Sequence, residues 1–451
     1  MRLGQNLILR GSRQQRGQTM ILVAVSIVSL LAMAALAIDV VTLYVASTEI
    51  QRAADAAALA GAKAMADSGI TTVPASYANF AAVQTLAQSM ATSAIAAVLA
   101  SPNNQVAGFA QAPGTPTFNF TPNSNGAIND PRVTVTLQQT GLPTFFAHIW
   151  GAKVASVTAS ATAEAYSPAN MENYTQISPK GVKPWLVANQ DPTTGPAYAN
   201  FVDPVTGDIE PNVISKEFWL TADCPTGGAG PGHGAGRCAP PLPNPTPGVA
   251  TIPEGLAVQY LPATVTANTA DVCSKSCASA SDYQTSIQCA DMNPYKCGGE
   301  PTTNNEWDMV DRINPNGSFS KADTTDGLEC LIHATGPGPD QGQDAINPGT
   351  WPTSPMHITP SGSTNLMSTS SSIATIPIID VNPADADFNP TTGAVTVIGF
   401  LQAFVEQFDG SNNIEIRVMN VVGCGQTPGG GPTVLGGNTS SPIAVRLITP
   451  P

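Results

Sequence analysis

The hydrophobic pattern of the chain begins with one long apolar segment, residues 20–38, which holds no charged residue and no proline. As a helix rising about 1.5 Å per residue it would span ~28 Å, close to the ~30 Å hydrocarbon core of a bilayer. Four arginines and no acid precede it, whereas Asp39 follows it. Because the positively charged flank stays in the cytoplasm, we predict one membrane-spanning helix with the bulk of the chain exported.

Two other interpretations of this segment stay open at this point. A buried core helix is equally apolar, but four preceding arginines are unusual for one. A cleaved signal peptide is the stronger rival, because Ala35-Leu36-Ala37 fits an A-x-A cleavage pattern. The apolar run, however, is longer than a usual signal-peptide core, and the helical pattern continues past this site without a break.

The same helix is predicted to continue through residues 39–66, which contain no proline and where nine of the fourteen residues from 53 to 66 are alanine, the best helix former. Charged side chains gather on one side of this helix, and a narrow face of mostly small residues lies opposite. Small residues allow close approach of a neighbour, either the protein's own next helix or a second helix-stalk protein in an assembly. The candidate packing face consists of Leu43, Ile50, Ala54, Ala57, Ala58, Gly61 and Met65.

Further along, the pattern predicts a second alanine-rich helix at residues 74–100 and strands at 132–138 and 153–166, where apolar and polar residues alternate. A helix followed by two strands makes a small α+β unit. Residues 1–100 hold five glycines and one proline, against 35 and 39 in the rest, so the chain becomes turn-rich. More strands are predicted at 373–380, 393–407, 413–422 and 442–448.

These patterns predict an α+β fold class: a transmembrane helix that continues into an exported helical stalk with a small β-sheet, then a mainly β, disulfide-containing domain. The predicted divisions are a basic cytoplasmic tail (1–19), the transmembrane helix (20–38), the stalk and small α+β unit (39–166), and the mainly β domain with long Gly/Pro-rich loops (167–451).

Composition narrows the function. The net charge is −14, and only 11% of residues are charged. Because the predicted exported part is acidic, nucleic acid is not expected as a partner. The chain contains no H-E-x-x-H, no G-x-S-x-G and no Gly-Lys dipeptide, and it has four histidines. We therefore predict a non-enzymatic protein and infer no cofactor, metal or small-molecule substrate. A catalytic triad assembled from distant residues stays open.

Cysteines are confined to the turn-rich part of the chain. An even number of cysteines in an exported region predicts disulfides, although the connectivity is not readable from sequence. A zinc site built from Cys273, Cys277, Cys289 and Cys297 is the alternative, but their spacing differs from C-x2-C pairs. The candidate disulfide cysteines are Cys224, Cys238, Cys273, Cys277, Cys289, Cys297, Cys330 and Cys424.

Several short motifs surround the apolar segment and its alanine-rich continuation. They are Arg16-Gly17-Gln18, Ala37-Ile38-Asp39-Val40, Leu43-Tyr44 and the run from Ile50-Gln51-Arg52 to Ala60-Gly61-Ala62, followed by weaker ones at 132–136, 144–147 and 159–163. In these motifs the region from about residue 16 to 166 resembles the TadE/TadG-like proteins of the tight-adherence, or Flp-type, pilus system. Leu22 stands where true prepilins of this class carry glutamate, so the resemblance does not imply prepilin-type processing.

The resemblance implies a bacterial protein of the inner membrane, with a cytoplasmic N-terminus, a periplasmic or extracellular bulk, and other pilus or envelope-assembly proteins as partners. The leading hypothesis is a structural or assembly component of a tight-adherence pilus or related envelope machinery. The first alternative is a surface-exposed adhesin or binding protein that uses the same anchor, and the second is an exported hydrolase. Loss of pili on deletion of the protein would favour the structural or assembly role over both alternatives.

Overall fold

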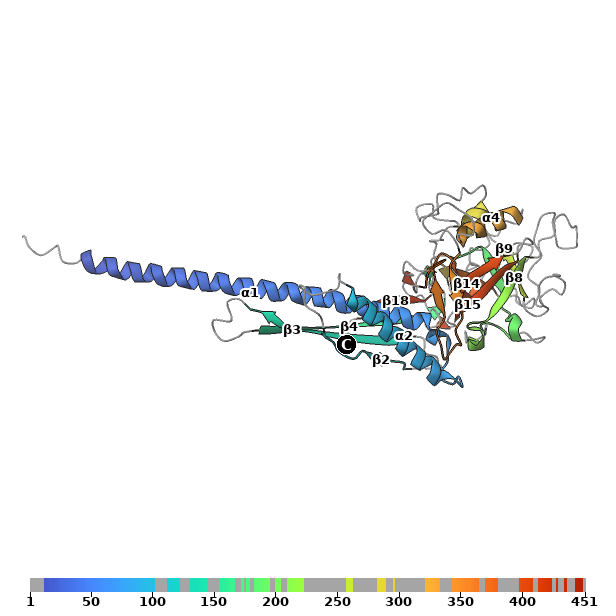
Figure 1. Ribbon diagram of the computed structural model, residues 1–451, viewed down its shortest axis with the longest axis horizontal. Coiled ribbons are helices and arrows are strands. Elements are labelled where there is room, and N and C mark those ends of the chain that lie inside the picture. Colours follow the sequence, from blue (N-terminus) through green and yellow to red (C-terminus); the bar gives the residue numbers. More distant parts are fainter. Residues whose placement is uncertain are drawn as a thin grey trace, which may run out of the picture.

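A long helix projects from a two-part folded head in this computed structural model (Figure 1). One part packs strands and a second helix along the inner half of the long helix, and the other part is a β-barrel. The structure describes residues 12–101, 112–121, 130–144, 154–166, 172–173, 176–178, 182–194, 199–203, 209–222, 257–262, 282–288, 295–296, 321–332, 343–364, 370–379, 397–408, 413–423, 427–428, 434–435 and 443–448.

Helix α1 (Ser12–Asp67) runs for 56 residues without a break. Neither proline nor an interior run of glycines interrupts it, and alanine fills much of its second half, so the interior of the helix forms at little conformational cost. The predicted continuity from apolar segment to stalk is therefore present in the structure. The helix ends at Asp67, where Gly69 takes a positive φ of 83° and turns the chain into the short 3₁₀ helix η1 (Ile70–Thr72).

Helix α2 (Phe80–Ala100) packs against α1. It begins six residues later than the sequence predicts, because Pro74 opens a turn instead of a helix: the Tyr77 amide donates to the Pro74 carbonyl at 3.0 Å. Asn79 then occupies the N-cap position. Proline fixes φ in both turns and first helical turns, so the pattern alone did not separate the two.

The strands beside α1 form one antiparallel sheet in the order β1-β3-β4-β18, with β2 also paired to β3. Val133, Val135 and Leu137 of β3 are fully buried on the face toward α1. On the other face, Thr134 and Thr162 hydroxyls lie 2.8 Å apart. The bounds are β1 Ala112–Pro113, β2 Thr117–Asn119, β3 Arg132–Pro143, β4 Val154–Tyr166 and β18 Ala444–Ile448.

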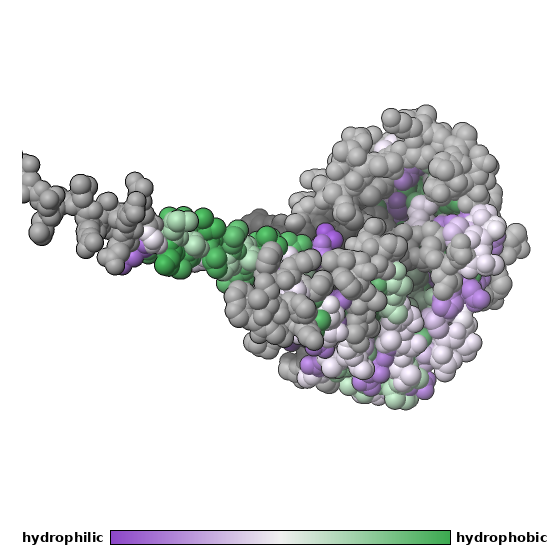
Figure 2. All heavy atoms as spheres, turned by 60° about the vertical axis from the view of Figure 1, so that its left-hand side comes forward, coloured by the Kyte–Doolittle hydropathy of each residue, from purple (hydrophilic) through white to green (hydrophobic). Residues whose placement is uncertain are grey.

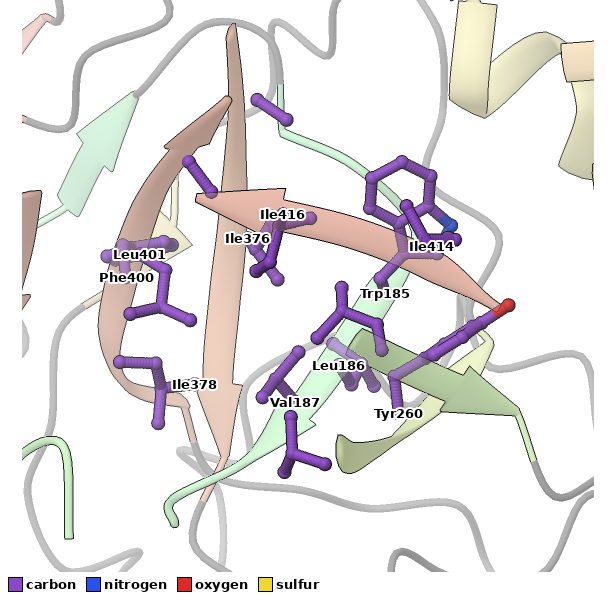
Figure 3. Packing of buried hydrophobic residues seen from close by; sticks show 14 of the residues in the cluster. Trp185, Leu186, Val187, Tyr260, Ile376, Ile378, Phe400, Leu401, Ile414 and Ile416 are labelled. Carbon is purple, nitrogen blue, oxygen red and sulfur yellow. The ribbon is translucent and has the colours of Figure 1, made fainter. Parts of the chain in front are cut away.

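Six strands close the second part into a barrel in the order β13-β14-β15-β8-β9-β7. Most neighbours are antiparallel, but β13 with β7 and β8 with β9 are parallel. Large side chains such as Trp185, Tyr260 and Phe400 fill the interior (Figure 3). The bounds are β7 Trp185–Ala188, β8 Glu217–Ala222, β9 Ala257–Pro262, β13 Ile373–Ile379, β14 Val397–Phe408 and β15 Ile414–Gly423.

Two short helices, α3 (Asp282–Gln288) and α4 (Lys321–Leu331), pack their apolar side chains into the barrel core. The buried Lys183 amine donates to the Ile287 carbonyl at 2.7 Å and ties α3 to the strand side. The remaining elements are η5 Pro192–Thr194, η6 Pro211–Val213, β5 Glu172–Asn173, β6 Gln176–Ser178, β10 Tyr295–Lys296, β11 Ala345–Asn347, β12 His357–Thr359, β16 Thr427–Pro428 and β17 Val434–Leu435.

The last strand of the chain belongs to the first sheet. β18 pairs antiparallel with β4, from Ala444 opposite Tyr166 to Ile448 opposite Thr162. The predicted division at residue 166 stays a prediction, and β18 crosses it. The structure has the mixture of helices and sheets that the sequence predicts. The described residues include one of the eight cysteines, so they do not establish disulfides in the second part.

Candidate functional site

The outer half of α1 presents an uncovered apolar surface (Figure 2). Among the described residues, sixteen of the eighteen exposed large hydrophobic side chains lie on this helix, from Met20 to Val45. Leu22 is 69% exposed and Leu30 is 67% exposed. Soluble monomers rarely expose contiguous apolar patches above a few hundred Å², so this surface requires a non-aqueous environment or a partner.

Two described helices are long and apolar enough to cross a membrane, by length and composition. In the window of the first, within α1, 6% of the residues are buried, against 28% for α2. Val83, Ala87 and Ala91 of α2 are fully buried in the cluster shared with α1, so the apolar character of α2 is explained by packing inside the folded unit. The outer half of α1 has no such explanation.

The inner half of α1 carries the candidate packing face, and the structure places this face inside the protein. Six of its seven residues are buried against α2 and the sheet, and Leu43 is half-buried at the edge of the same cluster. A Cβ on Gly61 would lie 2.9 Å from Ile95 Cδ1 and 3.2 Å from Val133 Cγ1. Here α2 and β3 approach the helix backbone closely, so this face is occupied by the chain itself.

A buried polar joint connects the end of α1 to the barrel. Thr72 Oγ1 donates to the side chain of Asn420 and lies 2.9 Å from the Val421 carbonyl. Asn420 Nδ2 in turn donates to the Ala66 carbonyl at 2.8 Å, near the end of the helix. Asn420 is fully buried. Because a buried amide is costly to leave unpaired, this joint fixes the barrel strand β15 against the helix end.

An aromatic contact supports the joint on a second side. The Trp351 indole N–H donates to the Ser68 carbonyl at 3.0 Å. Its ring stacks on Tyr77 with centroids 6.2 Å apart. Helix termini leave their last carbonyl groups without intrahelical partners, and the Trp351 and Asn420 side chains satisfy two such groups.

The returning strand β18 is held by a charge cluster around Glu164. This carboxylate is 2% exposed and accepts from Arg132 at 3.0 Å and from Arg446 at 2.6 Å. The Arg446 guanidinium also lies 4.3 Å from the ring centroid of Tyr166. A buried carboxylate needs such partners because desolvation is otherwise unfavourable. The cluster therefore fastens β18 to β4.

A second carboxylate cluster lies on the barrel. Glu217, Glu406 and Glu415 offer oxygen atoms within 4.8 Å of one another, and Arg417 pairs with Glu217 and Glu406. Burial first, then the hydrogen bond with Glu217, raises the pKa of Glu415 from 4.5 to about 7. Burial also raises the pKa of Glu406. Carboxylate oxygens suit hard cations, but the arrangement is equally that of an ion-pair network around one arginine.

The other candidate residues are only partly placed. Cys330 lies on α4 and is 6% exposed. The other seven candidate cysteines lie outside the described residues, so the disulfide network and the zinc alternative remain untested. His357 on β12 is the one described histidine, and it is not part of the carboxylate cluster.

Sequence reasoning missed the joint. Thr72 lies far from both Trp351 and Asn420 in the sequence, and no spacing motif links the three residues. One signal was present: Asn420 interrupts an apolar strand run, IEIRVMNVV, at a position where apolar residues surround it. A polar residue inside such a run indicates a buried hydrogen-bonding role.

Comparison with known proteins agrees with the anchor and stalk. Residues 17–64 match the family described as putative Flp pilus-assembly TadE/G-like. No curated protein and no solved structure matches the chain. The match confirms the resemblance for the helix, while the motifs beyond residue 64 stay outside it. The matched segment lies within α1, where it covers most of the exposed apolar half and most of the buried, alanine-rich half, and in this segment the chain is similar to the TadE/G-like family.

Proposed function

We propose that this chain is a single-pass, non-enzymatic component of Flp-type pilus assembly or related cell-envelope machinery. In this proposal residues 20–38 cross the bacterial inner membrane, the four N-terminal arginines remain in the cytoplasm, and the folded head lies on the exported side. The head would contact other pilus or envelope-assembly proteins.

One observation carries the proposal: the two halves of α1 have opposite environments. The outer half exposes its apolar side chains, and the inner half buries small residues under the protein's own sheet and second helix. This division falls within the segment that matches the pilus-assembly family. A lipid bilayer is the environment that suits the first half without changing the second.

The anchor is tested by placing a charge in the apolar segment. Leu30→Arg should weaken membrane retention, because arginine at a helix centre costs ~2.5–3.5 kcal/mol on insertion scales. The matched control is Leu447→Arg, at an exposed apolar position of β18. Alkaline extraction of native membranes would measure retention. Equal retention of both variants would contradict the anchor.

The assembly role is tested in the native cell. Deletion should abolish pili, and re-expression of the full chain should restore them. Affinity purification from native membranes should recover pilus-assembly proteins. Normal pili after deletion would contradict the proposal, and normal pili with lost surface attachment would identify an adhesin instead. Orientation is tested with alkaline phosphatase fused after Pro451. The enzyme is active only outside the cytoplasm, so activity of the fusion would support an exported head.

A further inference from the structure

The exposed apolar surface of α1 continues beyond the charge-free segment 20–38. Val41, Tyr44 and Val45 are 60%, 70% and 46% exposed. Their i, i+3 and i+4 spacing places them on one face of the helix, in line with exposed apolar residues of the preceding turns. One apolar face, here called the bare face, therefore runs from Met20 to Val45 and reaches the folded head (Figure 2).

The opposite face of the same turns is covered by the protein itself. Leu43 and Ala46 belong to the core cluster that α1 shares with α2 and the sheet. Asp39, one turn before Leu43 on this covered face, is 4% exposed. Protein atoms therefore surround α1 on this side from Asp39 onward, whereas the bare face stays apolar and exposed as far as Val45.

The threonine hydroxyls in these turns are bonded within the helix. Thr42 Oγ1 donates to the Ile38 carbonyl at 2.9 Å, and Thr48 Oγ1 donates to the Val45 carbonyl at 2.8 Å. Ser29 in the charge-free segment bonds to the preceding turn in the same way. A hydroxyl that donates to a carbonyl of its own helix needs no water as a partner. The turns up to Val45 are therefore as compatible with lipid as the charge-free segment is.

We infer that α1 crosses the bilayer inclined, with its bare face toward the membrane, so that lipid covers this face as far as Val45. The inference rests on the proposed function for the membrane position of α1. Lipid is the occupant because the bare face continues the proposed membrane-spanning surface without a break. Tyr44 lies at the outer end of this face, and tyrosine is a residue that membrane interfaces favour.

Two estimates of the inclination agree. From Met20 to Val45 the bare face is ~39 Å long, which fits a ~30 Å hydrocarbon core when the helix is inclined by about 40°. The apolar surface ends about 9 Å later on the bare face, at Val45, than on the covered face, at Asp39, and across a helix about 10 Å wide this offset again gives about 40°. Transmembrane helices reach inclinations of ~40°, so the angle lies at the upper end of the usual range.

An inclined helix has one side turned toward the bilayer and one side turned away from it. The covered face of α1 carries the sheet, because Ala46 and Leu43 pack in the cluster that includes β3 and β4. The sheet therefore lies on the side of α1 that is turned away from the bilayer. The inclination thus gives the folded head a defined orientation above the membrane.

The test measures which medium surrounds the bare face. The full chain is reconstituted into phosphatidylcholine vesicles with a nitroxide spin label on Val45→Cys, and the accessibility of the label to oxygen and to a water-soluble nickel chelate is measured. Arg52→Cys is the matched control, because Arg52 is exposed two turns further along the same face. Wild-type chain treated identically gives the background from native cysteines. We expect nickel accessibility to be at least several-fold lower at Val45 than at Arg52.

Two further labelled positions separate the possible outcomes. Ala34→Cys reports the proposed membrane span itself, and Val41→Cys repeats the measurement one turn before Val45. Oxygen access without nickel access at all three positions supports lipid on the bare face. Nickel access at Val45 with none at Ala34 would overturn this inference and leave the anchor intact, whereas nickel access at Ala34 would overturn the anchor as well. Protection of Val45 from both reagents would identify a protein on the bare face and overturn lipid as its occupant.

The same labels test the inclination. The ratio of the two accessibilities reports depth in the bilayer, and Ala34 and Val45 lie on the same face of α1. An inclination of about 40° predicts a depth difference of ~13 Å between these two labels, against ~17 Å for an upright helix. A measured difference of ~17 Å would overturn the inclined crossing.

Discussion

The two halves of the folded head are packed by opposite strategies. The unit around α1 is filled largely by alanine, with glycine at the closest approach, so that helix and sheet lie near one another. The barrel is filled by large side chains, among them Trp185, Tyr260 and Phe400. An alanine core gains little apolar area per residue and depends on many close contacts. In the barrel, each large side chain buries a large apolar area, so few residues supply much of the stabilisation.

This difference predicts opposite weaknesses. A large side chain in the barrel has much to lose on truncation, whereas an alanine-rich interface has little to lose on truncation and no room for enlargement. Truncation in the barrel should therefore cost more unfolding free energy than enlargement in the alanine-rich unit.

The largest effect is expected from Phe400→Ala in the barrel. Phe400 is fully buried, and removing such a ring costs about 3–5 kcal/mol of unfolding free energy. Urea unfolding followed by tryptophan fluorescence measures it. Leu447→Ala, at a partly exposed position, is the control and should change stability by less than about 1 kcal/mol. An equally small loss of unfolding free energy in Phe400→Ala would contradict the predicted dependence of the barrel on large side chains.

Enlargement at the alanine-rich interface should have the next largest effect. Gly61→Leu forces a branched side chain toward Ile95 and Val133 and should destabilise the stalk unit by about 1–3 kcal/mol, despite leucine's better helix propensity. Ala97→Leu, on the exposed side of α2, is the matched control. Helical circular dichroism during urea unfolding reports both. A stabilising Gly61→Leu would show that the interface has room to spare.

At the joint, Asn420→Ala should loosen the connection between the two parts. It removes a fully buried amide and leaves the Thr72 hydroxyl and the Ala66 carbonyl without that partner, at about 1–3 kcal/mol. Amide hydrogen exchange should accelerate at residues 66–73 more than in the barrel core. Asn119→Ala, at an exposed position of β2, should leave both unchanged. Unaltered exchange in Asn420→Ala would mean that Trp351 alone holds the joint.

The smallest effect concerns pH and the barrel carboxylates. Because burial and Glu217 raise the pKa of Glu415 to about 7, the folded state binds a proton more tightly than the unfolded state. This contribution to stability is present below about pH 4.5 and is lost as the pH rises toward 7. Glu415→Gln should therefore flatten the decline of the urea midpoint between pH 5 and pH 8. An identical decline in both proteins would assign the effect to other groups.

Sequence pattern was sufficient for the stalk. The length and apolar character of α1, its alanine-rich continuation, and the alternation in β3 and β4 are local signals, and each element forms where its own residues direct it. The start of α2 was displaced because Pro74 suits a turn as well as a helix. In this region local preference and tertiary packing agree.

The strand order of the barrel and the residues of the joint could not be predicted from local sequence pattern. Strands such as β13 are buried at every residue, so they carry no alternation that assigns their faces, and nothing local predicts that β7 closes the barrel beside β13. The sequence pattern predicts a strand at 442–448 within the second part, yet β18 pairs with β4 in the first. Partner choice over hundreds of residues depends on side-chain fit that a single sequence does not display.

The return of β18 to β4 decides how the head would resist force. The chain passes from the sheet to the barrel after Tyr166 of β4, and it returns to the sheet at Ala444 of β18, which lies opposite Tyr166. A pull on the barrel therefore loads β4 and β18 at the same end of the sheet. Force on the barrel is thus divided between two paired strands before it reaches α1.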